Sequence, residues 1–328
     1  MRVLCVGMMV CDISLYPVSP LIFQQDNCLI EPPIISTGGD ALNVAVGLAR
    51  LGIPVSIAGR VGKDSNGTFI KQSALNSGID TSSIIVDEHF PTAVSYVLID
   101  NDKERHFLTN NKIFSRINAK DVPIEMIEKS DIVYLGSAMA MDSMDDSGIE
   151  KIFSQARSMG KTTVLDTAIS NARPINWLER LEGALQNTDF FLPSLDEAKL
   201  LTGKDEPREI AASLGHFKFK ALAIKLGKKG CYITDFHREG IVSSLDNMPV
   251  KDTTGAGDSF VAGFICGVTQ GWDIFECAAF ANSIASQNVG AIGATNGIPD
   301  FESAQSFFDA HKGEMKRTEG AFKINSKR

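Results

Sequence analysis

The sequence predicts an α/β fold in which a doubly wound, mainly parallel β-sheet is flanked by helices. From about residue 118, short apolar runs alternate with helical stretches, which is typical of crossover connections between parallel strands. These runs end at polar residues or glycine, and open parallel sheets bind ligands at that edge. The composition, 44% hydrophobic and 22% charged over 328 residues, is ordinary for a globular protein, and the length allows one large domain or two small ones.

The first predicted element is a central strand. Residues 2–7 form a short apolar run that ends at Gly7, and Asp12 follows soon after. No G-x-G-x-x-G pattern comes next, which counts against a dinucleotide-binding fold and a dinucleotide-dependent oxidoreductase. After Gly38-Gly39, apolar positions between 41 and 51 predict a helix that Gly52 ends.

A small second sheet is predicted beside the main one. Residues 13–36 contain four prolines and predict irregular strands rather than a helix. Residues 92–99 alternate as a strand, residues 100–102 form a turn and residues 104–108 return, which predicts a hairpin. We expect the segments 13–36 and 91–110 to build the second sheet. The strand at 53–59 and the helix from 64 to 78 belong to the main fold.

The second half of the chain supplies the remaining strands. They are predicted at 132–135, 162–165, 190–192 and 221–226. The residues at or just after their ends are Ser137, Asp166, Glu197 and Gly227. A helix at 275–289 leads into a glycine-rich loop at 290–297. We assign residues 1–310 to one domain and residues 311–328 to a basic tail, in which six Lys or Arg and two Glu from Lys312 onward predict a solvated, frayed end.

Charge and cysteine usage exclude several classes of function. The net charge is −8 without a basic cluster in the body of the chain, which argues against nucleic acid as the partner. No apolar run reaches about 18 residues, so no membrane span is expected. The six cysteines have no zinc-binding spacing and several lie in apolar runs, which favours buried thiols. We therefore expect a cytoplasmic protein with a small-molecule ligand.

The most informative stretch is Asp252-Thr253-Thr254-Gly255-Ala256-Gly257-Asp258, a loop that opens into a helix poor in bulky polar residues. Its glycines leave the amides of residues 255–258 uncovered, and free amides at a helix start favour an anion. Asp258 lies where these amides converge, so it is a candidate catalytic base. The alternative is that Asp258 only caps the helix.

Two further glycine motifs have a functional and a structural interpretation. Gly38-Gly39 allow a ligand to approach the backbone, and the amide of Asn43 suits a hydroxyl-rich ligand. The alternatives are a tight turn and a solvated helix asparagine. Residues 227–230, Gly-Lys-Lys-Gly, are either a simple hairpin turn or a turn whose amides bind nucleotide phosphates together with Lys225.

Together, two of these stretches resemble the signatures of the ribokinase family, the PfkB-type carbohydrate kinases. Residues 252–258 match the C-terminal signature D-T-x-G-A-G-D at every fixed position, and residues 38–45 match the N-terminal signature G-G-x-x-x-N-x-A. The resemblance covers most of residues 1–310. It implies a ribokinase-like fold, in which the small sheet is a lid over the sugar, and ATP-dependent phosphorylation of a sugar or similar alcohol.

The resemblance also implies roles for individual residues. Asp258 would take the proton from the attacking hydroxyl, and the amides of Gly255, Ala256 and Gly257 would stabilise charge on the transferring phosphoryl group. The residues implied for the sugar are Asp12, Gly38, Gly39 and Asn43. Those implied for ATP are Lys225, Gly227, Gly230, Asn282 and Ser286. Those implied for a monovalent cation such as K⁺, which some members bind, are Asp252, Thr254, Asn288, Ala291 and Gly293.

Three positions depart from the family pattern. Ser194 replaces the asparagine of the N-x-x-E motif, while Glu197 remains and would hold the water shell of Mg²⁺; we keep Ser194 among the cofactor-binding residues. Asp166-Thr167-Ala168 stands where many members have Asp-Pro-Asn. Asp40 places an acid where ribokinase-like members often have lysine. These departures predict a changed substrate rather than plain ribose.

Nearby cations favour a substrate that carries a negative charge. Arg105 lies on the return strand of the predicted hairpin, Lys112 follows it, and Arg173 follows Asp166. With Asp166, they complete the expected substrate-binding residues and favour a sugar acid, since charge-assisted hydrogen bonds are strong. The alternative is that the cations are solvated surface charges.

Other functions remain open from the sequence. A phosphosugar kinase would use the same cations, and a nucleoside kinase would need an aromatic clamp, for which only Tyr16 and Phe23 are at hand. A non-catalytic sugar-binding regulator is opposed by the intact signature around Asp258. A homodimer through the lid is expected because an exposed small sheet has edges to cover.

Overall fold

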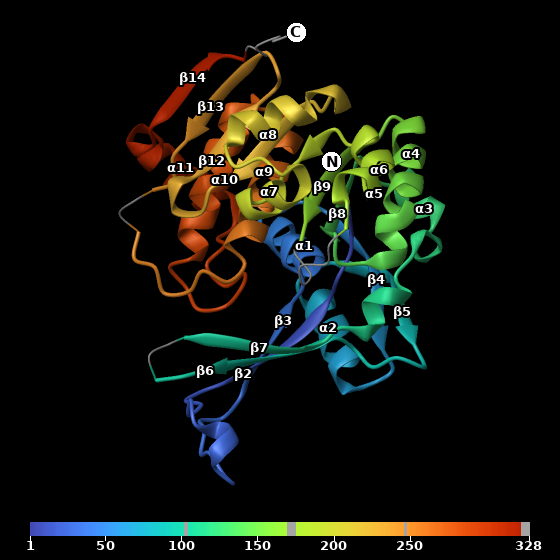
Figure 1. The fold of residues 1–328 in the computed structure, drawn as a ribbon, viewed down its shortest axis with the longest axis vertical. Helices are drawn as coiled ribbons and strands as arrows, with labels where there is room; N and C mark the ends of the chain where they lie inside the picture. The colour runs from blue at the N-terminus through green and yellow to red at the C-terminus, as the bar shows by residue number, and fades with distance from the viewer. Residues whose placement is uncertain (102–103, 169–174, 246–247, 323–328) are drawn as a thin grey trace.

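Ten strands form one large sheet in the computed structural model, which describes residues 1–101, 104–168, 175–245 and 248–322 (Figure 1). The strand order is β14-β13-β12-β11-β10-β9-β8-β1-β4-β5. The strands from β11 to β5 in this order pair in parallel, and β11 to β14 pair antiparallel. The strands are β1 (Val3–Val6), β4 (Val55–Gly62), β5 (Asp80–Asp87), β8 (Ile132–Ala138), β9 (Thr162–Thr167), β10 (Phe190–Phe191), β11 (Ala221–Lys225), β12 (Cys231–Thr234), β13 (Arg238–Val242) and β14 (Arg317–Ala321).

Helices cover both faces of this sheet, so the predicted doubly wound α/β fold is confirmed. Alternate residues of β1 enter two cores: Val3 and Cys5 pack with α1, α9 and α10, whereas Leu4 and Val6 pack with α4 and α8. The helices are α1 (Asp40–Arg50), α2 (Ser65–Asn76), α3 (Ile124–Glu128), α4 (Ile149–Ser158), α5 (Trp177–Arg180), α6 (Glu182–Gln186), α7 (Leu195–Thr202), α8 (Pro207–Leu214), α9 (Ala256–Gln270), α10 (Ile274–Asn288) and α11 (Phe301–His311).

A separate four-stranded sheet extends from one side of the main fold (Figure 1). Its order is β3-β2-β6-β7, with β2 (Val10–Leu15), β3 (Ile34–Gly38), β6 (Val94–Ile99) and β7 (Arg105–Asn110). The two predicted segments therefore do pair, although β2 and β3 reach a few residues beyond 13–36. Because side chains alternate between the faces of a sheet, the register assigns Asp12, Ser95 and Thr109 to one face. The opposite face holds Ile35, Tyr96 and Leu108.

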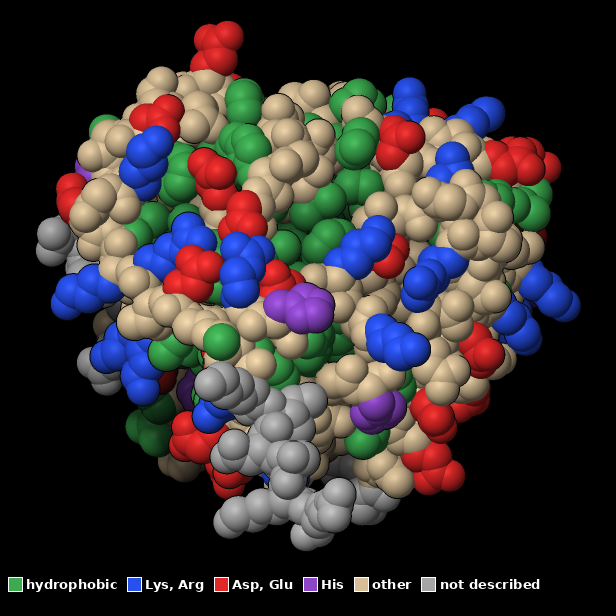
Figure 2. Space-filling model, turned by 90° about the horizontal axis from the view of Figure 1, so that it is seen from above, with side chains coloured by type: hydrophobic (Ala, Val, Ile, Leu, Met, Phe, Trp, Pro, Cys, Tyr) green, Lys and Arg blue, Asp and Glu red, His purple; other side chains and the backbone are tan. Residues whose placement is uncertain are grey.

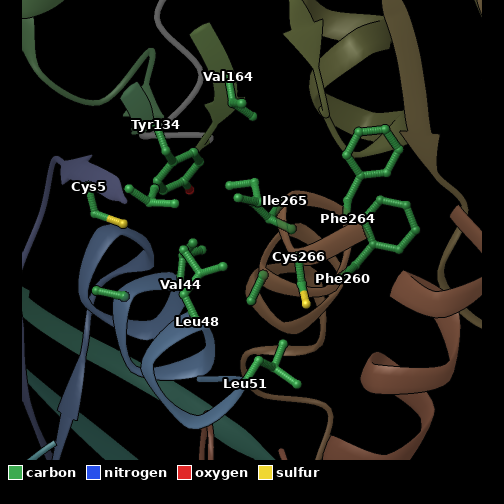
Figure 3. Packing of buried hydrophobic residues seen from close by; sticks show 14 of the residues in the cluster. Cys5, Val44, Leu48, Leu51, Tyr134, Val164, Phe260, Phe264, Ile265 and Cys266 are labelled. Carbon is green, nitrogen blue, oxygen red and sulfur yellow. The ribbon is translucent and has the colours of Figure 1, made fainter. Parts of the chain in front are cut away.

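Helices α1 and α9 cross in direct contact, although more than 200 residues separate them in the sequence. A Cβ on Gly47 would lie 2.8 Å from the Cβ of Ala262, so this glycine lets the two helices approach closely. Figure 3 shows Val44 and Leu48 of α1 on the side that faces Ile265 and Cys266 of α9. This packing fixes the N-terminal turns of the two helices relative to one another.

The C-terminal segment differs from the frayed tail that its composition predicts. Residues Arg317–Ala321 form β14, which pairs antiparallel with all five residues of β13. Without β14, the outer N–H and C=O groups of β13 would lack partners, and pairing outweighs the weak strand preference of the charged segment. The side chains of β14 remain exposed, as predicted. Residues 323–328 of the predicted tail lie outside the described residues.

The surface carries both signs of charge. On the face shown in Figure 2, Lys and Arg side chains are interspersed with Asp and Glu. Among the residues that the structure describes, no helix is long and apolar enough to span a membrane.

Candidate active site

The candidate base Asp258 lies in the first turn of α9, at the crossing with α1. Gly255 precedes the helix with a φ of 70°, and a Cβ there would lie 2.1 Å from the carbonyl oxygen of Ala294, so only glycine fits. Asn43 donates a 2.8 Å hydrogen bond from Nδ2 to Oδ2 of Asp258. Burial raises the pKa of Asp258, and the hydrogen bond from Asn43 partly opposes this rise. The carboxylate of Asp258 is thus held by another helix, which a simple helix cap does not require.

The two N-terminal glycines make room for a second carboxylate. A Cβ on Gly38 would lie 2.1 Å from Oδ2 of Asp12, and one on Gly39 would lie 2.5 Å from the carbonyl oxygen of Met8. Burial, and then the charge of Asp258, raises the pKa of Asp12 to about 6. The structure therefore brings Asp12, Gly38, Gly39 and Asn43 to one place, next to Asp258.

A buried ion pair lies on the other side of the α9 N-terminus. Lys225 donates from Nζ to both oxygens of Asp166, over 2.7 and 2.8 Å. The Cβ position of Gly257 is 3.6 Å from this Nζ, so the ammonium group adjoins the first turn of α9. Burial works against the charge of Lys225, but Asp166 and Glu197 hold the pKa of its ammonium group above the ordinary value. Asp166, predicted among the substrate residues, is engaged here with Lys225.

A cavity of about 390 Å³ opens beside this ion pair. Five of the six residues predicted for the nucleotide line it, Ser194 being the exception, together with two of the predicted anion-binding residues. These lining residues are Lys225, Gly227, Gly230, Asn282, Ser286, Ala256 and Gly257. Gly230 has a φ of 90°, and a Cβ on it would lie 2.0 Å from the carbonyl oxygen of Val242, so the glycine is required by the turn itself.

The apolar walls of this cavity were not predicted from the sequence. They include Leu245, Met248, Val250, Phe260, Ala285 and Val289. Such residues look like ordinary core positions in a sequence. They come from the segment after β13, from α9 and from the end of α10, and this shared position is a signal only once the cavity is known. An apolar slot that ends at two lysines and a helix N-terminus suits a flat aromatic base attached to phosphates.

The family assignment rests on the whole chain. A family model described as pfkB family carbohydrate kinase matches residues 1–300. The chain belongs to the pfkB family of carbohydrate kinases. This confirms the resemblance inferred from the two glycine signatures and makes the protein a carbohydrate kinase.

Individual relatives of this pfkB family member agree with the assignment. It is 30% identical over 285 residues to a 2-dehydro-3-deoxygluconokinase of Bacillus subtilis, covering 84% of this chain and 87% of the relative. It is 25% identical over 288 residues to a 5-dehydro-2-deoxygluconokinase of Geobacillus kaustophilus, covering 84% and 85%. Its fold matches that of a ribokinase II-type protein from E. coli in complex with ATP and Mg²⁺, with a TM-score of 0.80 at 22% identity, over 94% of this chain and 99% of the other.

In this family member, Ser194 and Glu197 form a capping box at the start of α7. Glu197 accepts hydrogen bonds from the amide of Ser194 at 2.7 Å and the hydroxyl of Thr167 at 2.9 Å, both on Oε2. The hydroxyl of Ser194 accepts from the amide of Glu197. Serine caps a helix about as well as asparagine does, so the replacement keeps the start of α7 intact. Magnesium binding by Glu197 stays a prediction.

The predicted cation site joins two loops. Asp252 accepts hydrogen bonds from the amides of Thr254 and Gly293, both at 2.8 Å. The side-chain amide of Asn288 donates to the backbone carbonyl oxygen of Ala294 at 2.8 Å. The backbone carbonyl oxygen of Asn288 accepts a hydrogen bond from the amide of Ala291. The loop before α9 and the loop after α10 are therefore tied together beside Gly255. Binding of K⁺ by these carbonyl-rich loops stays a prediction.

The three predicted cations lie in different surroundings. Arg105 is the first residue of β7 and pairs with Ile99 of β6. Lys112 lines another cavity, of about 350 Å³, together with Phe90 and Trp177. Arg173 lies outside the described residues. Contact of these cations with the sugar stays a prediction.

Proposed function

We propose that this carbohydrate kinase transfers the γ-phosphoryl group of ATP to a hydroxyl of a sugar acid. The observation that carries the proposal is the hydrogen bond between Asn43 and Asp258. It links Asp258, which follows the cavity-lining Ala256 and Gly257, to the helix that starts beside Gly38 and Asp12, which supports a base between the two sites. A base located between a polyol-binding corner and a phosphate-binding cavity is the arrangement that phosphoryl transfer to an alcohol needs.

In the proposed reaction, Asp258 accepts the proton of the attacking hydroxyl as the oxygen approaches phosphorus. Burial raises its pKa, which makes the ionised carboxylate a stronger base. Asn43 holds one carboxylate oxygen, so the other is free to face the hydroxyl. Asp12 accepts hydrogen bonds from neighbouring hydroxyls and orients the sugar.

The same helix start neutralises the charge on the phosphoryl group. The amides of Gly255, Ala256 and Gly257 are at the positive end of the α9 dipole, and Lys225 adds a full positive charge beside Gly257. Mg²⁺ would be held through water by Glu197, whose Oε1 has no hydrogen-bonding role in the capping box, and would neutralise charge on the phosphates. The adenine would enter the apolar part of the cavity near Asn282 and Ser286.

A sugar acid is favoured over a neutral sugar by two observations. The two relatives named above are called 2-dehydro-3-deoxygluconokinase and 5-dehydro-2-deoxygluconokinase, so both names denote kinases of sugar acids. Independently, Arg105 belongs to β7 of the small sheet, and Asp12 belongs to β2 of the same sheet. A guanidinium group over the sugar would recognise a carboxylate through charge-assisted hydrogen bonds.

The test of the function is product formation from ATP with a panel of acceptors. We expect phosphorylation of 2-dehydro-3-deoxy or related sugar acids, and slower phosphorylation of neutral hexoses and ribose. If a nucleoside or a phosphosugar is the preferred acceptor, that compound is the substrate instead of a sugar acid, and the proposed mechanism is unchanged. Sugar binding by calorimetry without turnover of any acceptor would identify a non-catalytic sugar-binding protein instead.

Replacing Arg105 with alanine should separate acid recognition from polyol recognition. We expect KM for the sugar acid to rise roughly 10- to 150-fold, the equivalent of about 1.5–3 kcal/mol for a hydrogen bond to a charged group, while KM for a neutral sugar barely changes. Arg116→Ala is the matched control, since Arg116 lies over the ring of Phe90. Equal, small effects on both acceptors would leave a polyol kinase without a carboxylate-binding role for Arg105.

We also propose that two copies of the chain associate through the small sheet. Its outer face exposes Ile35, Tyr96 and Leu108 by 52%, 42% and 54%. Exposed apolar side chains on a sheet with free edges favour burial against a second copy. We expect a dimer at micromolar concentration by sedimentation, and a monomer for Leu108→Lys. Phe107→Lys, on the opposite face, should remain dimeric; a monomeric parent protein would contradict the proposal.

A further inference from the structure

Asp40, the first residue of α1, has a carboxyl group with one satisfied and one unsatisfied oxygen. Oδ1 accepts a hydrogen bond from the amide of Ala41 at 2.8 Å and another from the hydroxyl of Ser137. Oδ2 is inaccessible to solvent and has no hydrogen-bond partner among the residues that the structure describes. A buried carboxylate oxygen without a donor makes the charged form of Asp40 costly.

A second unsatisfied group adjoins the first. The hydroxyl of Tyr134 is fully buried and also has no partner within the described part of the chain. A Cβ atom on Gly136 would lie 2.6 Å from this hydroxyl and 3.1 Å from Oδ2 of Asp40. Glycine at 136 therefore leaves space for both polar atoms. Figure 3 shows Tyr134 close to the buried side chains that α1 and α9 contribute to the same core.

The backbone at the end of β8 is strained in a way that serves this pair. Ser137 has a φ of 66°, which is unfavourable for a residue with a side chain, and it is fully buried. That conformation directs its hydroxyl to Oδ1 of Asp40. The strain is consistent with a requirement to hold the carboxyl group in one orientation.

Asp40 is coupled to the candidate base through the first turn of α1. Asn43, three residues further along and on the same side of the helix, holds Asp258. Burial, and then the charge of Asp258, raises the pKa of Asp40 to about 7, against the hydrogen bonds from Ser137 and Ala41 and the charge of Lys225. Among the residues that the structure describes, Lys225 is the cation that opposes this rise.

The remaining groups around the pair keep Tyr134 protonated. Burial and the charges of Asp166, Asp40, Asp258 and Cys5 raise the pKa of Tyr134 far above its usual range. Tyr134 is therefore a hydrogen-bond donor at any working pH. Its hydroxyl and Oδ2 of Asp40 both adjoin the Cβ position of Gly136, so this hydroxyl is a candidate donor to the ionised carboxyl group.

We propose that Asp40 is a positioning residue that sets the basicity of Asp258, with Tyr134 as the donor that permits Asp40 to ionise. Ionised Asp40 keeps a negative charge behind the base and strengthens it, whereas neutral Asp40 leaves a weaker base. The proton of the sugar hydroxyl goes to Asp258; Asp40 does not receive it. The inference rests on the proposed role of Asp258 as the base. It adds Asp40 as a second acidic residue that controls the strength of that base.

The first test is the dependence of kcat/KM on pH. We expect the activity of the parent protein to fall as the pH drops through about 7, as Asp40 gains its proton. In Asp40→Asn, the fall near pH 7 should be absent, and the remaining acidic limb, set by Asp258 itself, should lie about one pH unit lower because no like charge adjoins the base. In Tyr134→Phe, the limb should move up, since the ionised carboxyl loses its donor.

The second test needs no activity. A carboxyl group whose pKa rises on folding from about 3.9 destabilises the folded state as the pH rises through this interval. The gain in Tm of Asp40→Asn over the parent should therefore grow by several degrees between about pH 4 and pH 7. In an Asp258→Asn background, this growth should shrink, because the repulsion between the two carboxylates is absent.

Asp145→Asn is the matched control for the second test. Asp145 is buried, holds the amides of Met139 and Met141, and has a pKa raised to about 7, mainly by burial. Arg180 and Asp142, rather than Asp258, act on it. The effect of Asp145→Asn on Tm should therefore be the same in the parent protein and in the Asp258→Asn background. Opposite shifts of the acidic limb and a Tm gain that depends on Asp258 would support the proposal.

The proposal is overturned if neither Asp40→Asn nor Tyr134→Phe moves the acidic limb, or if the Tm gain of Asp40→Asn is the same in both backgrounds. Failure of the proposed function gives a different result. In that case no acceptor is phosphorylated at any pH, while the Tm comparison still reports whether Asp40 and Asp258 interact.

Discussion

Replacing Asp258 with asparagine is expected to lower kcat by about 10²- to 10⁴-fold, the usual contribution of a general base. An amide cannot accept the proton of the attacking hydroxyl, yet it keeps the size and one hydrogen-bonding oxygen of the carboxyl group. The Cβ clearances around Gly255 and Gly38 are unchanged, so the positions of ATP and sugar should not shift. Rapid-quench or coupled assays give kcat, and calorimetry gives the dissociation constants of both ligands, which should stay within a few-fold of the parent values.

Asp273→Asn provides the comparison. Asp273 precedes α10 and caps it through the amide of Phe275, so it is an acidic residue at the start of a neighbouring helix without a place in the candidate site. Turnover should be unaffected by this change. If Asp258→Asn behaved in the same way, the alternative that Asp258 only caps α9 would be restored and the proposed mechanism abandoned.

Replacing Lys225 with methionine is expected to destabilise the fold by about 3–5 kcal/mol, because it leaves a buried carboxylate without its cation. The side chains of Lys225 and Asp166 are only 14% and 3% exposed, so water cannot replace the lost charge. Activity should fall as well, since the phosphoryl group loses the cation beside Gly257. Urea unfolding measures the first effect, and kcat/KM for ATP measures the second.

A double variant separates these two effects. In Lys225→Met with Asp166→Leu, both charges are gone and much of the lost stability should return, as replacement of whole buried ion pairs by apolar side chains is often nearly neutral. The activity should not return. Lys228→Met, an exposed lysine that lines the same cavity, should leave stability unchanged. A stable single variant would show that Lys225 is not needed to balance Asp166.

The sequence allowed the main architecture and the centre of the site to be predicted, because both depend on local patterns. Glycines at 38, 39, 230 and 255 are each required by a clearance or a positive φ, so they leave a visible signature. The small sheet could be predicted because its hairpin alternates clearly. In contrast, the ion pair of Lys225 with Asp166 joins two strands separated by β10, and no pattern in the sequence indicates such a contact.

Two other features required the structure for a similar reason. The apolar walls of the 390 Å³ cavity resemble any core residue until the cavity is seen. The last strand was interpreted as a tail because its composition is polar and its side chains are exposed. Only the hydrogen-bonding needs of β13, which lies far earlier in the chain, make it a strand.

That last strand has a consequence for how the protein is made. The edge of the large sheet at β13 stays open during synthesis until Arg317–Ala321 has been added, although nearly all the rest of the sheet is already available. In the growing chain this edge, next to the half-exposed Ile241, offers unpaired groups to any neighbouring nascent strand. Folding is therefore most exposed to intermolecular pairing just before Arg317–Ala321 is added, and a chain shortened to residue 310 would keep that vulnerability permanently.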